Sequence, residues 1–330
     1  MDLCPVASVD FRPRLCWVSW NFLLCQCSSR GPADHRLVKV SVCLIQPENY
    51  AHWQAFFEVA QLLCASFESL GHRCPLRTNW VEPGALNIVI GYHFLAPEHI
   101  DSFARASCIF YQLEQLSAHE GWLTPDRERV LRAASEIWDY SDENVTFLRA
   151  KGFTNVSHLP LGYHPALHRI EHRPETEKDV DVLFYGARNE RRGAVLNQIR
   201  ERFGLRTLFG VYGPARDEWI ARSRVVLNIH FYEMKVSEQV RVSYLLNNEC
   251  FVVSEESDGD AFAGGMVTGA HEDLSGLCER YLADPEARKI VAARGLELLR
   301  QRPMVGYLEQ VVDTLPPLLA CGETREEIEA

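Results

Sequence analysis

The sequence predicts an α/β protein with two doubly wound, Rossmann-like domains that face each other across a cleft. Along most of the chain, strand-like apolar runs alternate with segments that carry apolar residues at helical spacing. This alternation is typical of parallel sheets covered by helices on both faces. A polar segment with two prolines, residues 164–178, interrupts the alternation and marks a connection between two domains. The length of 330 residues also exceeds what one ordinary core accommodates.

Residues 37–163 supply the first α/β series. A β-branched run at 37–45 ends at Gln46-Pro47, which predicts a strand and a turn. Apolar residues at helical spacing over 52–70 stop at Gly71, a favourable helix C-cap. Further strands are expected at 86–90, 108–113, 136–140 and 156–159, and further helices at 97–106, 127–134 and 142–151.

Residues 164–330 open with the connection and continue with the second series. Strands are expected at 180–185, 206–211, 225–229 and 250–254, with one very short strand at 266–267. Helices are expected at 190–203, 216–222, 236–246, 274–282, 285–300 and 305–315. Ligands of doubly wound sheets bind outside the carboxyl ends of the strands. Two facing sheets therefore predict one deep ligand cleft.

Residues 1–36 stand apart from both series. An apolar run at 15–24 follows Arg12 and Arg14 and superficially resembles a signal peptide. The run is too short to span a bilayer, and no small-x-small cleavage site follows it cleanly. We interpret this segment as a poorly ordered N-terminal extension. Membrane association through it is an alternative that we do not expect.

Charge and cysteine usage restrict the class of protein. A net charge of −11 argues against a partner such as a nucleic acid, whose phosphates select a basic surface. A nucleotide remains compatible, because a few arginines grip a diphosphate locally. Of the 11 cysteines, most lie in apolar runs, and Cys25-Gln26-Cys27 lacks a second pair at zinc-ligand spacing. This usage predicts a protein of the reducing cytoplasm.

The strongest local signal is the strand-to-helix junction in residues 179–192, DVDVLFYGARNERR. Gly186 lets the backbone approach a ligand, and the following helix N-terminus favours negative charge. Arg188, Asn189, Arg191 and Arg192 add donors that suit a diphosphate. A solvated basic first turn is the alternative, but positive charge is unfavourable at a helix N-terminus. We therefore predict an anion site here.

A second group of polar residues gathers at two later strand ends and one helix N-terminus. Carboxylates suit the hydroxyls of a ribose or sugar, an arginine suits phosphate, and amide or imidazole groups orient the ligand. An ordinary ion-paired surface helix is the alternative, mainly for Glu238. The predicted members are Asn228, His230, Glu238, Arg241, Ser254 and Glu255.

The Asp-x-Asp pattern, which some sugar-transferring enzymes use to hold a divalent metal, occurs at two places. Asp179 and Asp181 stand at the beginning of a predicted strand, the end opposite the cleft. Asp258 and Asp260 stand in a loop that is closer to the cleft in this prediction. Neither context is convincing, so we predict no metal site.

At this point the chain resembles a known family. Residues 156–165, VSHLPLGYHP, are similar to the hinge of group-1 glycosyltransferases. The Gly186 loop, residues 209–213 with Tyr212, and residues 241–254 follow in the order of that family's donor domain. The pattern is most similar to spore-maturation-type members. Over residues 37–315 the resemblance implies a GT-B fold, no metal requirement and no cofactor, with a nucleotide-diphosphate sugar as co-substrate bound by the C-terminal half.

One position departs from the family pattern. Many relatives carry a glutamate three residues after the helical arginine, where the resemblance implies a contact with the donor ribose. Here that position is Tyr244, and Glu238, Glu255 or Glu256 is the candidate replacement. A catalytically silent nucleotide-sugar-binding protein and a sugar-nucleotide epimerase of the same fold therefore remain open beside the glycosyltransferase.

The N-terminal half is expected to hold the acceptor, a saccharide or another hydroxyl compound. His93 follows a predicted strand, and an imidazole near its ordinary pKa suits proton removal from a hydroxyl. Glu114, after the next strand, is the rival base, and a purely structural His93 is the alternative. Tyr111 and Trp122 are further candidates for stacking on an acceptor sugar, although an ordinary core role is the favoured interpretation of each.

Overall fold

A computed structural model describes residues 39–95, 99–100, 103, 106, 108–116, 121–233, 237–259 and 262–313. These residues all belong to one compact unit of the chain, Leu37–Ala330. The predicted extension, residues 1–36, and the end of the chain lie outside the described residues, as does most of the helix expected at 97–106.

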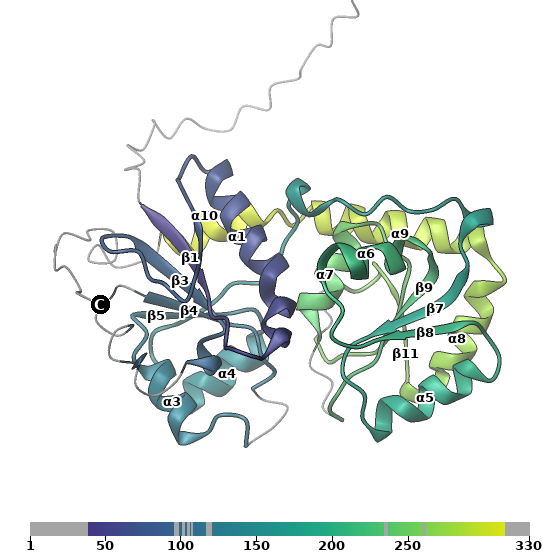
Figure 1. The fold of residues 1–330 in the computed structure, drawn as a ribbon, viewed down its shortest axis with the longest axis horizontal. Helices are drawn as coiled ribbons and strands as arrows, with labels where there is room; N and C mark the ends of the chain where they lie inside the picture. The colour runs from purple at the N-terminus through teal and green to yellow at the C-terminus, as the bar shows by residue number, and fades with distance from the viewer. Residues whose placement is uncertain are drawn as a thin grey trace, which may run out of the picture. The chain divides into compact units, whose positions relative to one another are not determined.

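The first sheet has six parallel strands in the order β2-β1-β3-β4-β5-β6 (Figure 1). Its strands are β1 Val40–Leu44, β2 Leu76–Thr78, β3 Leu86–Ile90, β4 Cys108–Gln112, β5 Glu136–Asp139 and β6 Val156–His158. The short edge strand β2 was not predicted, because its three residues are only partly buried and carry no apolar run. The central strands are buried throughout, as their apolar sequences require.

The second sheet has five parallel strands in the order β11-β10-β9-β7-β8. Its strands are β7 Val180–Tyr185, β8 Leu205–Leu208, β9 Ser223–Asn228, β10 Val252–Glu255 and β11 Val267–Gly269. No strand pairing joins the two sheets, so the predicted pair of doubly wound sheets is confirmed for the described residues. Strand β8 ends three residues before the predicted boundary, which leaves Phe209 62% exposed.

Helices cover both faces of each sheet. On the first sheet, α3 Pro125–Arg132 and α4 Asp142–Ala150 pack on one face, and α1 Phe57–Ser69 packs on the other beside α10 Met304–Val312. The chain's last described helix thus returns to the first sheet. In Figure 1, α10 is the yellow helix beside α1.

On the second sheet, the helices divide between two core clusters. Helices α5 Glu190–Arg200 and α8 Leu274–Leu282 contribute to one cluster, while α6 Gly213–Ala221 and α7 Gln239–Asn247 contribute to the other. Helix α9 Pro285–Arg300 packs against α7 and α8. Helix α6 begins earlier than predicted because Pro214, in its first turn, suits a helix N-terminus.

The connection at residues 164–178 is bound to the end of α7 rather than loose. The Asn248 side-chain oxygen accepts hydrogen bonds from the backbone N–H groups of Arg169 and Ile170, at 2.8 and 3.0 Å. Asn247 accepts from the backbone N–H of His164 at 3.1 Å. Short 3-10 turns, Pro165–Leu167 and Glu175–Glu177, complete the segment. The backbone of this segment is therefore fastened to the end of helix α7.

The chain passes twice between the sheets, and the two passages touch. The Tyr163 N–H donates to the Arg302 carbonyl at 2.9 Å, and the Met304 N–H donates to the Tyr163 carbonyl at 2.9 Å. A Cβ on Gly162 would lie 2.5 Å from the Arg302 carbonyl oxygen and 2.7 Å from the Met304 nitrogen. Only glycine fits at this crossing, which lies within the predicted hinge sequence.

Candidate functional site

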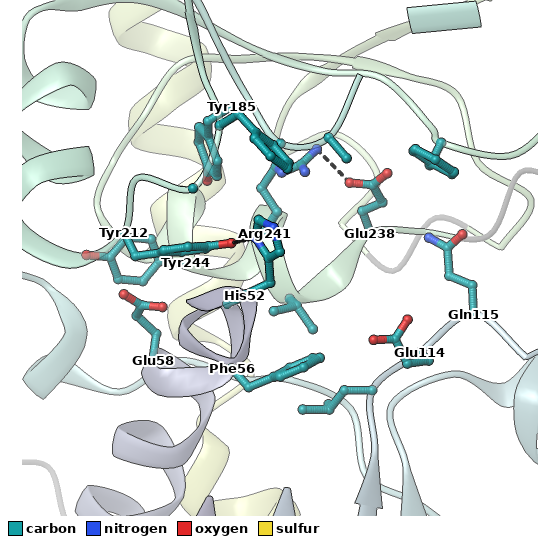
Figure 2. Close-up of a pocket in the computed structure, with 18 of the residues that line it drawn as sticks. His52, Phe56, Glu58, Glu114, Gln115, Tyr185, Tyr212, Glu238, Arg241 and Tyr244 are labelled. Atoms are coloured by element: carbon teal, nitrogen blue, oxygen red, sulfur yellow. Dashed lines mark hydrogen bonds and ion pairs between the residues drawn. The ribbon is translucent and has the colours of Figure 1, made fainter. Parts of the chain in front are cut away.

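A cavity of about 540 Å³ opens at the carboxyl ends of strands from both sheets, where the sequence predicts the ligand cleft. Its size is that of a typical small-molecule site. Figure 2 shows Tyr185, Arg241 and Glu238 on one side of the cavity and Phe56, Glu114 and Gln115 on the other. Of the predicted site residues, those that line the cavity are His93, Glu114, Trp122, Gly186, Arg192, Tyr212, Glu238 and Arg241.

On the side of the cavity formed by Tyr185, Arg241 and Glu238, which we call the cavity wall, a carboxylate is held between two guanidinium groups. Glu238 accepts from Arg192 at 2.6 Å through one oxygen and pairs with Arg241 at 2.6 Å through the other. Burial raises the pKa of Glu238, but Arg241 and Arg192 outweigh burial and hold it below its ordinary value. Burial lowers the pKa of Arg192 to about 10. Glu238 and Arg192 are therefore both charged at neutral pH, and together with the Arg241 guanidinium they give the cluster a net positive charge.

Arg241 and Glu238 form an ion pair, but the pair is buried, whereas the alternative considered from the sequence was an ion pair on the helix surface. Their side chains are 15% and 12% exposed, and Arg241 also donates to Asn228 at 2.7 Å. The Arg241 guanidinium lies over the Tyr185 ring. Such a buried, multiply bonded arginine is held in one orientation, unlike a solvent-exposed i,i+3 pair.

Gly186 leaves room for Arg241. Its φ is +133°, and a Cβ there would lie 2.8 Å from Arg241 Nη2. Asn189 caps α5 by accepting from the Arg192 N–H at 2.9 Å, and its amide donates to the Phe231 carbonyl at 2.7 Å. These two residues follow β7 in the predicted manner and place Arg192, not Arg191, in the cavity wall.

Arg191 and Arg188 lie outside the cavity lining. Arg191 pairs with Glu255 through two hydrogen bonds, one of them 2.7 Å long, and donates to the His230 carbonyl at 3.0 Å. Burial raises the pKa of Glu255, and Arg191 brings it below its ordinary value. Arg188 is exposed, with no ion pair or hydrogen bond among the described residues. Neighbouring arginines thus have different environments that sequence alone does not distinguish.

Asn228, Ser254 and His230 support the wall from behind. Asn228 is 1% exposed, receives the Arg241 hydrogen bond and donates to Ser254 Oγ at 3.0 Å. His230 Nε2 lies 3.1 Å from both the Glu256 carbonyl and Ser257 Oγ. These three predicted residues are buried and orient neighbours, and none of them lines the cavity.

Aromatic side chains form the cavity rim. Tyr212 Oη lies 2.6 Å from His52 Nδ1, and the His52 ring contacts the rings of Tyr50 and Phe209. Tyr50 is 43% exposed and Phe209 62% exposed, although both are large and apolar. Exposed aromatic rings at a cavity mouth suit stacking on a flat or pyranose ring. The sequence pattern places Phe209 in a strand and therefore does not indicate its exposed ring.

Tyr244, at the position where the resembled family carries glutamate, joins a second buried network. Its hydroxyl donates to Asp217 at 2.8 Å and accepts from Arg169 Nε at 3.0 Å. Arg216 donates to Glu58 at 2.9 Å and to Asp217 at 2.7 Å, and its guanidinium lies over the Tyr244 ring. Two carboxylates therefore already neutralise Arg216, although it lines the cavity.

His93 and Glu114 meet on the first sheet's side of the cavity, with His93 Nε2 3.7 Å from Glu114 Oε1. Burial, assisted by Arg127, lowers the pKa of His93 to about 3, so the imidazole is neutral. Burial raises the pKa of Glu114 to about 7, although Arg127 opposes the rise. Glu114 therefore has the pKa of a general base at neutral pH, and His93 lies among the rings of Phe94 and Trp122.

Both members of the first acidic pair weighed as metal ligands have other partners. Asp179 pairs with Arg222, while Asp181 accepts from Arg224 at 2.9 Å and from the Gly204 N–H at 2.9 Å. Asp260 of the second motif lies outside the described residues. In the described part of the chain, no group of three or more His, Cys, Asp or Glu side chains is placed to hold a metal ion.

Comparison with known proteins places the fold. No protein-family model and no curated protein matches the sequence. Among solved structures, WaaG, a glycosyltransferase involved in lipopolysaccharide biosynthesis, superposes with a TM-score of 0.52 at 12% identity over 83% of this chain and 99% of that one. A DNA-modifying β-glucosyltransferase gives 0.53 at 11% identity over 84% and 99%.

The match to TarM covers 69% of this chain but only 54% of that protein, at 6% identity and a TM-score of 0.49. The matches to WaaG and to the β-glucosyltransferase, both above 0.5, extend over nearly the full length of those proteins. Together with the two parallel sheets, they show that the chain has a GT-B-like fold. The fold predicted from the sequence is therefore confirmed.

Proposed function

We propose that this chain is a glycosyltransferase that moves a sugar from a nucleotide-diphosphate donor to an acceptor hydroxyl. The observation that carries the proposal is the net positive Arg192–Glu238–Arg241 cluster, which lines a cavity at the strand ends of a GT-B-like fold. In this proposal the diphosphate binds beside Arg241 and the Gly186 backbone. Glu238 keeps both guanidinium groups oriented before the ligand arrives.

The arrangement of these residues supports the following reaction. The acceptor oxygen attacks the anomeric carbon while the bond from that carbon to the diphosphate breaks. Arg241 and Arg192 stabilise the charge that develops on the leaving nucleotide diphosphate. Glu114 takes the proton of the acceptor hydroxyl, since burial raises its pKa to about 7. The two arginines supply the neutralisation that a metal ion would otherwise provide, so we propose a metal-independent reaction without a cofactor.

The rim and the neighbouring network bear on specificity. Phe209 and Tyr50 offer exposed ring faces to a sugar or base at the cavity mouth. Of the candidates for the contact that a family glutamate would make to the ribose, Glu238 lines the cavity, whereas Glu255 and Glu256 do not, so we assign this contact to Glu238. The residues of the Gly186 loop and of α7 also lead us to propose that the chain is related to the spore-maturation-type glycosyltransferases.

The proposed setting is the cytoplasm. Each of the six cysteines that the structure describes is a free thiol, as expected in a reducing compartment. No helix in the described part of the chain is long and apolar enough to cross a membrane. Partners in this proposal are the donor and a saccharide or other hydroxyl acceptor, with no nucleic acid.

A thermal-shift panel of nucleoside diphosphates and their sugars tests the proposal. A ligand that binds only the folded state raises the melting temperature. At a ligand concentration a hundredfold above Kd, the free energy of unfolding increases by about 2.7 kcal/mol. The best ligand then enters a transfer assay with and without acceptor. Transfer or donor hydrolysis supports the glycosyltransferase, binding without release of sugar supports a silent binding protein, and conversion of the donor without acceptor supports an epimerase. If none of the ligands raises the melting temperature, the proposal is contradicted.

A further inference from the structure

A second cavity, of about 340 Å³, lies at the opposite end of the second sheet. Most of its lining residues precede β7, begin β9 or precede β10, and α9 contributes its first two turns. In a parallel sheet these amino ends face away from the carboxyl ends that form the proposed donor site. A ligand bound here would therefore be distinct from the donor.

The lining of this cavity is basic, in contrast to the chain's net charge of −11. Five Lys and Arg side chains line it, against two Glu side chains. Glu175 pairs with Arg224 at 3.2 Å and also with Arg288. Arg224 Nη1 donates to Asp181 at 2.9 Å, which leaves its Nη2 without an acceptor among the described residues.

Lys178 is the unbalanced charge of the cavity. It is partly buried and makes no hydrogen bond or ion pair with the residues described. Burial lowers its pKa, although Glu175 opposes this effect. The adjacent carboxylate does not neutralise it, because Asp179 pairs with Arg222. A partly desolvated ammonium that is in no direct ion pair destabilises the folded state unless a bound anion compensates it.

The backbone holds Lys178 in this place. It follows the Glu175–Glu177 turn and precedes β7, and the Val180 N–H donates to the Arg222 carbonyl at 3.3 Å. Its ammonium and Arg224 Nη2 are donors without acceptors in the described structure. Ammonium and guanidinium groups are the side chains that bind phosphate oxygens in proteins.

We propose that the second cavity binds a small phosphate-bearing molecule, with Lys178 and Arg224 as its ligands. The volume exceeds that of a bare ion and falls in the range of small-molecule sites. Glu175, already paired with two arginines, orients them rather than repelling the anion. The proposal concerns a site separate from the donor cavity and does not depend on the transferase activity.

Isothermal titration calorimetry of the full chain with inorganic phosphate and with glycerol 3-phosphate tests this site. We expect both to bind, with glycerol 3-phosphate tighter if the cavity accepts an organic phosphate. Lys178→Gln is expected to weaken phosphate binding at least about tenfold, because one charge-assisted contact is lost. Lys178→Arg keeps the charge and is expected to keep most of the binding.

Two further variants separate this site from alternatives. Lys289→Gln is the matched control, since Lys289 lines the same cavity but pairs with Glu286 at 2.8 Å, and we expect unchanged binding. Arg241→Ala alters only the first cavity, so phosphate binding that persists in it supports the second site. The proposal is overturned if phosphate binding is lost in Arg241→Ala but unchanged in Lys178→Gln. It is also overturned if neither phosphate nor glycerol 3-phosphate binds.

A stability measurement provides an independent check. Without phosphate, Lys178→Gln removes an uncompensated charge, so its melting temperature is expected to equal or exceed that of the unaltered chain. Phosphate should raise the melting temperature of the unaltered chain and narrow or reverse this difference. If Lys178→Gln lowers the melting temperature equally with and without phosphate, Lys178 has a structural role and the proposal fails.

Discussion

Replacing Arg241 with alanine is the most informative perturbation of the proposed donor site. The guanidinium contacts Glu238 at 2.6 Å and Asn228 at 2.7 Å, and its Nη2 lies against Gly186. If Arg241 stabilises the leaving diphosphate, its loss removes a contact that strengthens in the transition state. We expect turnover to fall by about 10²- to 10³-fold, or roughly 3–4 kcal/mol of barrier.

The cost to folding is expected to be smaller. Glu238 keeps its 2.6 Å contact with Arg192, so the substitution does not leave the buried carboxylate unpaired. Asn228 loses one donor but keeps its hydrogen bond to Ser254. Charge-assisted hydrogen bonds of this kind contribute about 1.5–3 kcal/mol each, and the remaining arginine compensates part of the loss. We therefore expect a loss of about 1–3 kcal/mol in the free energy of unfolding.

The assay compares single-turnover transfer with urea unfolding for the same preparations. The donor is the nucleotide sugar that gives the largest thermal shift. Arg200→Ala is the matched control, because Arg200 is an exposed arginine on α5 that bonds only Asn197 among the described residues. Arg241→Lys should restore folding more fully than turnover, since an ammonium lacks the two-pronged contact of a guanidinium.

Near-normal transfer by a folded Arg241→Ala protein would refute the placement of the diphosphate beside α7. Equal loss of turnover in the alanine and arginine-to-lysine variants, with unchanged stability in both, would instead support a contact that requires the guanidinium shape. A Gly186→Ala variant offers a second route to the same question. Its Cβ would enter the space of Arg241 Nη2 at a φ of +133°, so we expect weaker nucleotide binding than in the unaltered chain.

Four further predictions concern other parts of the structure. Because the pKa of Glu114 is about 7, kcat/KM should rise with pH up to about 7 and then level off, and Glu114→Gln should abolish transfer. Between the unfolded pKa of 4.5 and the folded pKa of about 7, Glu114 stays protonated only in the folded state, so the folded state loses stability as pH rises through this range. Urea unfolding at pH 8 should therefore find Glu114→Gln more stable than the unaltered chain. A less stable variant would contradict the argument from burial. Gly162→Ala should cost about 1–3 kcal/mol of unfolding free energy, since its Cβ would meet backbone atoms of the second passage; an unchanged denaturation midpoint would contradict this contact. Transfer should persist after exhaustive treatment with a chelator, and activity that is lost and then restored by manganese or magnesium would show that a metal is required.

The sequence by itself determined the layered architecture, because strand and helix periodicities are local properties. The run at residues 180–185 became β7 with the predicted bounds, and Gly71 and Gly152 both take positive φ where helices were predicted to end. The expectation that ligand-binding groups collect at strand ends is equally topological. It located the cavity near Gly186, Glu238 and Arg241 before any contact was known.

Only the tertiary structure decided which polar groups face the cavity. Arg191 and Arg192 are adjacent in sequence, yet one bonds Glu255 behind the wall and the other bonds Glu238 within it. Tyr244 gains its partners from Arg169 and Asp217, 75 and 27 residues away. A side chain's partner and its pKa depend on burial and on charges brought together by packing, and no local sequence pattern carries that information. For the same reason, only the folded chain shows that Lys178 makes no hydrogen bond or ion pair with the described residues.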